Sequence, residues 1–321
     1  MSLSLSTLYK FTIIIPFRWL VFGNFWISIG AALMGLSSYV LLFDSVRINY
    51  ELAPLWILFF GTLATYNLCV FYTKGTASEK FEFIYKKRNA LKIIFFLSLI
   101  LLIPAPFFLT LNQFWFLVHL AIISIFYTVP IHIELPSDEI LEEEINGKQN
   151  LNENKKEEKL SKKSYLSVPA WRNIPYLKIF LIAYVWASAT VIFPMLHEDL
   201  IIQNSKTIAL FFERFFFTLA ITIPFDIRDK EGDKRVGLNT LVSLLTPQNS
   251  KILALCLLVI CSVLIYYFHI NYLFHFGIVY ILTAFLIIGS SNKRSEWYFT
   301  GFIDGLFVVE FLILTSNFIN T

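Results

Sequence analysis

Nine long apolar runs constrain the fold of this chain more than any other feature. They lie at residues 19–42, 52–73, 91–110, 112–132, 175–196, 206–225, 251–269, 271–289 and 299–318. Each is close to the roughly 20 residues that a helix needs to cross the hydrocarbon core of a bilayer. The chain is 57% hydrophobic and only 15% charged, which is far from the average of soluble proteins. The sequence therefore predicts an all-α integral membrane protein with nine transmembrane helices.

The basic residues predict the orientation of these helices, because cytoplasmic flanks are enriched in Lys and Arg. With the N-terminus inside, 23 of the 26 Lys and Arg residues fall on the inner side, and Arg47, Lys206 and Arg214 remain for the outer side. We therefore expect a multi-pass protein of the cell (inner or cytoplasmic) membrane with a cytoplasmic N-terminus. The basic residues gather where anionic lipid headgroups lie, so the bilayer is the expected partner and nucleic acid is not.

A charged insert divides the apolar runs into two groups. Residues 134–171 are acidic first and then basic, with little apolar content. Such a composition predicts a solvated, disordered cytoplasmic loop. It separates helices 1–4, in residues 1–133, from helices 5–9, in residues 172–321, and all nine are expected to form one membrane domain.

Three carboxylates lie together in the segment FDIRDKEGDKRVGLNTL, residues 225–241. In a helix, Asp226, Asp229 and Asp233 share one face, at the cytoplasmic end of the sixth span. Two interpretations remain open. The acids either form ion pairs at an amphipathic helix end, or face a cavity and bind a divalent cation, since Mg²⁺ takes one or two carboxylates and shares its other positions with water and substrate phosphates. Pro224 favours a cavity, because proline disturbs a helix.

The same segment resembles the second aspartate-rich motif of the UbiA superfamily of intramembrane prenyltransferases. The matching positions are Asp226, Asp229, Glu231, Gly232, Asp233, Lys234, Gly237, Thr240 and Leu241. The segments FYTVP, from Phe126, and WRNIPYLKIFLIAYVWASATVIFP, from Trp171, resemble parts of the family's fourth and fifth helices. The resemblance implies a UbiA-type helical bundle with a cavity on the cytoplasmic side.

The resemblance also implies a reaction and a set of site residues. The family transfers a prenyl group from a polyprenyl diphosphate to a lipophilic acceptor in the membrane, with Mg²⁺ stabilising the charge on the leaving diphosphate. The implied metal ligands are Asp229, Asp233 and Asp226. The implied catalytic residues are Asp226, Lys178 and Arg228, and the implied donor-binding residues are Lys74, Asn67, Arg18 and Asn24.

The first aspartate-rich motif of the family is absent from this chain. The motif reads Asn-Asp-x-x-Asp-x-x-x-Asp, and this chain reads TYNLCVFYTKG in its place. With the motif's Asn aligned on Asn67, its three Asp positions are taken by Leu68, Phe71 and Gly75. Half of the expected metal site is therefore missing, although Lys74 offers a point charge to a phosphate at the same level.

Three hypotheses about function follow from this mixture. The first is a divergent prenyltransferase that keeps one Mg²⁺ on Asp229 and Asp233. The second is a non-catalytic relative that binds lipid or assists assembly. The third is a transporter, because ionisable residues within membrane spans are functional candidates; those in this chain are His119, Glu213, Arg214, Asp304 and Glu310. We expect Asp304 to border the same cavity as the three aspartates, and Glu310 to hydrogen-bond to a neighbouring helix.

Overall fold

The structure confirms the predicted bundle of membrane-spanning helices. It is a computed structural model that describes residues 15–43, 48–72, 78–129, 131–134, 165–168, 174, 176–196, 204–235 and 240–319. Within these residues, nine helices are long and apolar enough to cross a membrane: Phe25–Phe43, Ala53–Phe71, Arg88–Phe108, Leu111–Thr128, Leu177–Met195, Ser205–Asp233, Pro247–Phe268, Ile270–Gly289 and Tyr298–Ser316. They follow the predicted runs in order, because a spanning helix satisfies its backbone internally and needs a continuous apolar stretch.

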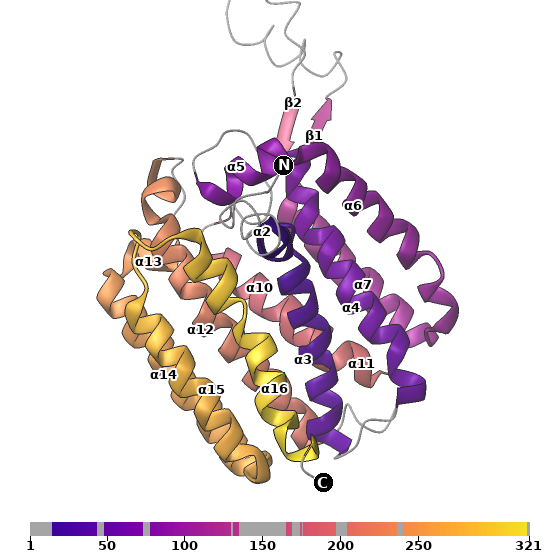
Figure 1. The fold of residues 1–321 in the computed structure, drawn as a ribbon, viewed down its shortest axis with the longest axis vertical. Coiled ribbons are helices and arrows are strands. Elements are labelled where there is room, and N and C mark those ends of the chain that lie inside the picture. Colours follow the sequence, from indigo (N-terminus) through magenta and orange to yellow (C-terminus); the bar gives the residue numbers. More distant parts are fainter. Residues whose placement is uncertain are drawn as a thin grey trace, which may run out of the picture.

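The elements follow one another along the chain as helices joined mostly by short turns (Figure 1). Before the insert lie α2 (Ile15–Phe22), α3 (Phe25–Phe43), α4 (Ile48–Leu68), the 3₁₀ turn η2 (Cys69–Phe71), α5 (Glu79–Lys86), α6 (Arg88–Leu102), the 3₁₀ turn η3 (Ala105–Phe108) and α7 (Leu111–Thr128). After it lie α10 (Leu177–Ala187), the π-helix η6 (Ser188–Ile192), α11 (Phe193–Met195), α12 (Ser205–Arg235), α13 (Leu241–Leu244), α14 (Pro247–Phe268), the 3₁₀ turn η7 (Ile270–Tyr272), α15 (Leu273–Gly289), the π-helix η8 (Tyr298–Ile303) and α16 (Leu306–Ile319).

Helix α12 is central to the packing of the second half, where it contacts α10 on one side and α14 on the other. Helix α3 packs against both α4 and α16, so an early helix of the chain and its last helix lie side by side (Figure 1). The rings of Trp186 and Phe307 stack at 4.5 Å between centroids and join α10 to α16. This arrangement brings α10, α12 and the η8–α16 segment around a common space.

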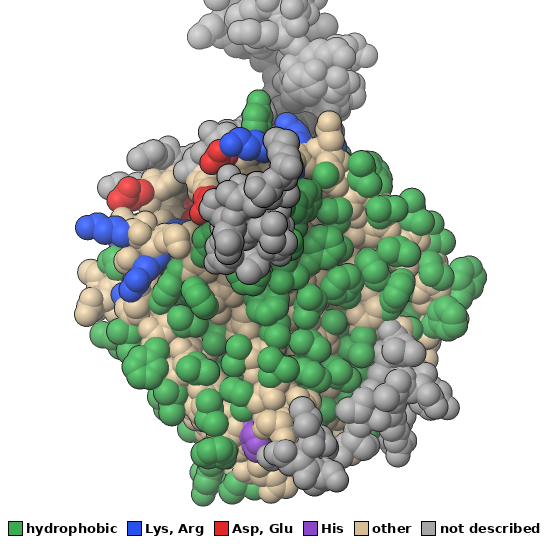
Figure 2. All heavy atoms as spheres, viewed as in Figure 1, with side chains coloured by type: hydrophobic (Ala, Val, Ile, Leu, Met, Phe, Trp, Pro, Cys, Tyr) green, Lys and Arg blue, Asp and Glu red, His purple; other side chains and the backbone are tan. Residues whose placement is uncertain are grey.

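The surface of the bundle has an apolar middle and a charged end, as expected for a membrane protein. Hydrophobic side chains cover the middle of the face shown in Figure 2, and the charged side chains on that face gather at the end that carries α5 and α13. Large apolar residues such as Phe107, Phe274 and Phe285 are strongly exposed. Exposure of this extent is unfavourable in water and is expected where lipid replaces water.

The first apolar run is broken, which the sequence prediction of a single helix over 19–42 did not anticipate. Helix α2 ends at Phe22, and the spanning helix α3 begins only at Phe25. Between them Asn24 has a φ of 66°, a left-handed conformation that Asn adopts more readily than most residues. A Cβ at Gly23 would lie 2.3 Å from the Trp19 carbonyl oxygen, so this close turn requires glycine.

Helix α12 is longer than its apolar run predicted. The prediction was a span over 206–225, whereas the helix runs from Ser205 to Arg235. Pro224, which the sequence analysis expected to disturb the helix, lies inside it, and the helix continues beyond it. The interpretation of Asp226, Asp229 and Asp233 as residues of one helix is confirmed.

Two short strands lie at the ends of the insert. Strands β1 (Ile131–Glu134) and β2 (Tyr165–Val168) pair antiparallel, with Ile131 opposite Val168 and Glu134 opposite Tyr165. The sequence prediction placed an unstructured loop over 134–171 and did not anticipate this pairing. Most of the insert, at 135–164, lies outside the described residues.

A buried ion network links four helices on the side of the bundle away from the three aspartates. Arg214 of α12 lies 2.5 Å from Glu310 of α16 and 3.2 Å from Glu213, and it donates to Ser37 of α3 at 2.9 Å. Tyr280 of α15 donates to the second oxygen of Glu213 at 2.6 Å. The predicted link of Glu310 to a neighbouring helix is therefore present as an ion pair.

Candidate functional site

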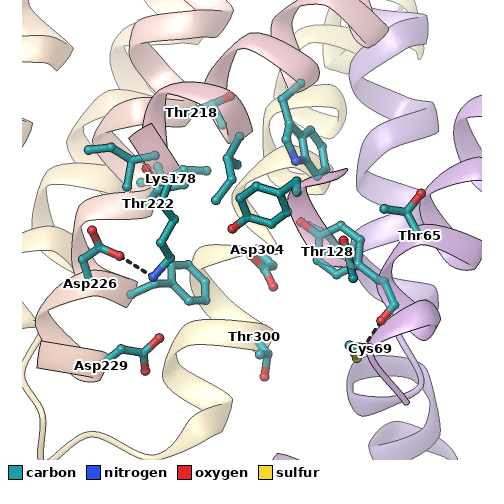
Figure 3. A pocket seen from close by; sticks show the side chains of 18 of the residues that line it. Thr65, Cys69, Thr128, Lys178, Thr218, Thr222, Asp226, Asp229, Thr300 and Asp304 are labelled. Carbon is teal, nitrogen blue, oxygen red and sulfur yellow. Dashed lines mark hydrogen bonds and ion pairs between the residues drawn. The ribbon is translucent and has the colours of Figure 1, made fainter. Parts of the chain in front are cut away.

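A cavity of about 360 Å³ lies between α4, α5, α7, α10, α12 and the η8–α16 segment (Figure 3). Much of its wall is apolar, with Ile179, Ile182, Ile221, Phe225 and Phe307 among the lining residues. Along α12 the lining changes from apolar and hydroxyl groups to Asp226 and Asp229. One end of the cavity is therefore charged and the remainder suits a hydrocarbon group.

Lys178 and Asp226 form an ion pair at the charged end. Lys178 lies in the first turn of α10, after Tyr176 in a left-handed conformation with φ 63°. Its Nζ donates to Asp226 Oδ1 at 2.8 Å and lies 3.9 Å from Asp233 Oδ2. The Asp226 side chain is only 2% exposed, so its charge depends on this partner. Two predicted catalytic residues, 48 positions apart, are thus in direct contact.

Arg228 holds two acidic residues at once. Its Nε and Nη2 donate to the two oxygens of Asp229 at 2.7 and 3.0 Å, and its Nη1 donates to Glu296 Oε2 at 2.9 Å. The guanidinium also lies 5.2 and 5.1 Å from the ring centroids of Phe225 and Phe299. Paired hydrogen bonds to a carboxylate and contacts with aromatic rings fix the planar group in one orientation.

Three further acidic or basic residues line the cavity. Asp304 does so as the sequence predicted, whereas Lys80 and Glu296 were not identified from the sequence. Lys80 follows the second span on the short helix α5, and Glu296 precedes the ninth span. Neither residue stands in a recognisable motif, and only their position just outside an apolar run marks them. The described lining therefore holds four carboxylates, on Asp226, Asp229, Glu296 and Asp304, and three cations, on Lys80, Lys178 and Arg228.

The predicted donor-binding residues lie elsewhere, as far as they are described. Asn24 Nδ2 donates to Asn67 Oδ1 at 3.1 Å, and Asn67 Nδ2 donates to the carbonyls of Leu63 and Gly23 at 2.9 and 3.3 Å. Arg18 pairs with Glu79 at 2.9 Å. Asn24, Asn67 and Arg18 are absent from the cavity lining, and Lys74 lies outside the described residues.

We expect Asn67 to act as a structural residue that holds the α2–α3 break against α4. The change Asn67→Ala leaves the buried Asn24 amide without its acceptor and removes the donor to the Gly23 carbonyl, so it should lower the free energy of unfolding by about 1–3 kcal/mol. Unfolding of the purified protein in detergent measures the loss. Asn24→Gly keeps the left-handed turn and should cost less. A variant with unchanged stability but a lost response to prenyl diphosphate would instead place Asn67 in the donor site.

The described carboxylates are not arranged for a multi-ion cluster, and of Asp229 and Asp233 only Asp229 lines the cavity. No group of three or more His, Cys, Asp or Glu side chains in the described part of the chain is arranged to hold a metal. Asp229 and Asp233 are one helical turn apart. The Asp229 side chain is 37% exposed, and Asp233 Oδ2 is buried without a hydrogen-bond partner among the described residues. Two carboxylates are enough for Mg²⁺ when a substrate phosphate supplies further oxygens.

Comparisons with known proteins agree with this architecture. The model of the UbiA prenyltransferase family matches residues 169–300. A structure described for digeranylgeranylglyceryl phosphate synthase is 17% identical and has a TM-score of 0.53, covering 95% of this chain and 99% of that chain. A UbiA homologue from Archaeoglobus fulgidus bound to GPP and Mg²⁺ is 12% identical with a TM-score of 0.53, covering 93% and 99%.

The same homologue bound to DMAPP and Mg²⁺ is 13% identical with a TM-score of 0.52, covering 93% of this chain and 97% of that chain. No curated protein matches the chain. At these identities the solved structures show the shared fold, and the family model covers the segment that begins directly after the second strand and ends within the π-helix η8. The chain thus has the fold of the UbiA homologues and resembles the UbiA prenyltransferase family in sequence.

Proposed function

We propose that the chain is a divergent prenyltransferase, which transfers a prenyl group from a prenyl diphosphate to a lipophilic acceptor in the bilayer. The observation that carries this proposal is the cavity, which joins a charged end to an apolar wall inside a fold that binds GPP and DMAPP in a solved homologue. The diphosphate lies at the charged end and the prenyl tail lies against the apolar residues of α10 and α12. The charged end faces the cytoplasm, in agreement with the distribution of Lys and Arg.

Lys178 and Arg228 bind the diphosphate in this proposal. Both are already held in place by carboxylates of α12, and Arg228 is also held by Glu296. An anionic ligand replaces Asp229 as a partner of Arg228, while Glu296 and the two phenylalanine rings keep the guanidinium oriented. Asp229 is then free to serve as a ligand.

The charge balance of the cavity supports a cation cofactor. The lining contains four carboxylates and three cations, so a diphosphate adds negative charge to a site that has no surplus of positive charge. Asp229 and Asp233 would hold one Mg²⁺, which supplies the missing positive charge and stabilises the leaving diphosphate. Asp226 keeps Lys178 charged and directed into the cavity, because the two groups are in direct contact.

A non-catalytic relative that binds a prenyl lipid is the second candidate. It is favoured by the absence of carboxylates at the positions of the first motif and by the pairing of Asp226 and Asp229 with cations of the same chain. A transporter is less consistent with the structure, because Glu213, Arg214 and Glu310 are paired with one another and do not line the cavity.

Thermal unfolding with geranyl diphosphate tests donor binding. In the presence of Mg²⁺ the ligand should raise the unfolding midpoint, because it binds only the folded state, and EDTA should remove the rise. The double change Asp229→Asn/Asp233→Asn should abolish the Mg²⁺-dependent rise and leave the midpoint without ligand nearly unchanged. Glu82→Gln, which removes an exposed carboxylate of α5, is the matched control. No rise with any prenyl diphosphate would contradict the proposal.

Transfer itself separates the two candidates. Isotope-labelled geranyl diphosphate is incubated with the protein in native lipid extract, and label is followed into a lipid product. A product that requires Asp229 and Asp233 supports the transferase. Binding without product favours the non-catalytic relative.

A further inference from the structure

The carboxyl group of Asp304 lines the cavity, and it has no role in the proposed binding of the diphosphate. It lies at the break between the π-helix η8 and α16, and it is among the residues that line the cavity. In Figure 3 it lies between the Lys178–Asp226 pair and Thr128 of α7. Asp304 therefore faces the same space as the diphosphate site from a different helix.

The Asp304 carboxyl makes no hydrogen bond or ion pair with a described residue, although the charges of Lys80 and Arg228 act on it from a greater distance. Two of the three cations in the described lining, Lys178 and Arg228, are engaged by Asp226, Asp229 and Glu296. A carboxyl in a partly apolar cavity is costly unless it binds a hydrogen-bond donor. Lys80 and Arg228 act on Asp304 only through their charge, so a ligand group that donates a hydrogen bond would supply the direct contact that they do not make.

Close contacts of the backbone around Asp304 hold its side chain toward the cavity. The π-helix η8 ends immediately before Asp304, whose backbone N–H donates to the Phe299 carbonyl at 3.1 Å. Trp26 of α3 donates its indole N–H to the Gly301 carbonyl at 2.9 Å. A Cβ on Gly305 would lie 2.5 Å from that carbonyl oxygen and 3.1 Å from the indole nitrogen. π-Helical turns of this kind occur frequently at functional sites.

We propose that Asp304 is a catalytic residue that binds the acceptor by accepting a hydrogen bond from its hydroxyl group, aliphatic or phenolic. This assignment rests on the proposed prenyl transfer. A diphosphate is repelled by the carboxylate and offers it no donor at neutral pH, so Asp304 faces the second substrate. An ammonium group also donates, but it has no lone pair with which to attack carbon.

The step balances without a further reactant. The bond between the allylic carbon and the diphosphate oxygen breaks, and its electron pair leaves with the diphosphate. A lone pair of the acceptor hydroxyl forms the new carbon–oxygen bond. The hydroxyl proton moves to the Asp304 carboxylate, and the products are a prenyl ether and diphosphate.

Matched ligands test the assignment without knowledge of the natural acceptor. Dodecanol and para-nonylphenol donate a hydrogen bond, whereas their methyl ethers do not. In lipid nanodiscs containing the wild-type protein, Mg²⁺ and geranyl diphosphate, at least one hydroxyl compound should raise the unfolding midpoint above its methyl ether. Asp304→Leu should remove this difference and keep the response to geranyl diphosphate. The two hydroxyl compounds distinguish an aliphatic from a phenolic acceptor.

Two further variants complete the test. Asp304→Asn keeps an accepting oxygen but cannot take a proton, so it should bind the hydroxyl compound and form the ether about 10²–10⁴-fold more slowly than the wild type. Thr315→Val alters the same helix at a residue that bonds only within it, and should behave as wild type. Equal stabilisation by alcohol and ether, or a difference that survives in Asp304→Leu, would overturn the assignment. Binding of a hydroxyl compound without any ether product from the wild type would overturn the proton transfer.

The outcomes for the donor and for Asp304 are distinguishable. A wild-type protein that does not respond to geranyl diphosphate contradicts the proposed function, whichever acceptor is present. A protein that responds to geranyl diphosphate but treats alcohol and ether alike keeps the proposed function and loses only the role of Asp304.

Discussion

Replacing Arg214 by Met is expected to destabilise the protein by about 3–5 kcal/mol, because removal of one partner from a buried ion pair leaves an uncompensated charge. The Arg214 side chain is fully buried, and Glu213 and Glu310 are each 1% exposed. Without the guanidinium, both carboxyl groups lie in the bundle without a cation among the described residues, and the Ser37 hydroxyl loses a donor. Equilibrium unfolding in mixed detergent micelles measures the loss.

The controls for Arg214 separate loss of the network from loss of a charge. Lys206→Met removes an exposed cation from the same helix and should leave the midpoint unchanged. Combining Arg214→Met with Glu213→Leu and Glu310→Leu should recover part of the stability, because apolar residues tolerate burial without partners. An Arg214→Met protein as stable as the wild type would show that the network does not hold α3, α12 and α16 together.

Most of the fold was predictable from the sequence because the bilayer imposes one strict requirement on a spanning helix. Each needs a membrane-length apolar stretch, and all nine stretches can be recognised in the sequence. The break at Gly23 and Asn24 was not predictable from hydropathy, because it depends on a left-handed residue rather than on polarity. The extension of α12 beyond Phe225 could not be predicted from hydropathy either, because this end of the helix is charged and lies outside the apolar run.

The site was predictable only where its residues share a local pattern. Asp226, Asp229 and Asp233 recur at helical spacing, so their common helix could be inferred from the sequence alone. Lys178 was predicted from the resemblance, and the structure places its Nζ 2.8 Å from Asp226. The contact of Arg228 with Glu296, 68 positions later, follows from the packing of α12 against η8. No periodicity within one segment could have indicated it.

Replacing Lys178 by Met should have the second large effect, and it should act on both stability and ligand binding. The change leaves Asp226, with a side chain 2% exposed, without its cation. Because Lys178 is itself 22% exposed and water reaches it, the loss of stability should be smaller than for Arg214→Met. The protein should also lose its stabilisation by geranyl diphosphate, since one of the cations that bind the diphosphate is gone. Thermal unfolding with and without the ligand measures both effects.

Two further variants show which effect comes from which contact. Lys178→Arg keeps the positive charge and should retain most of the stability and part of the ligand response. Lys178→Met combined with Asp226→Asn removes the uncompensated carboxylate, so stability should recover while the ligand response stays lost. If the response returned with stability, Lys178 would serve only to neutralise Asp226. If Lys178→Met alone kept the full response, the diphosphate would be bound by Arg228 and the metal without help from α10, and the role proposed for Lys178 would be wrong.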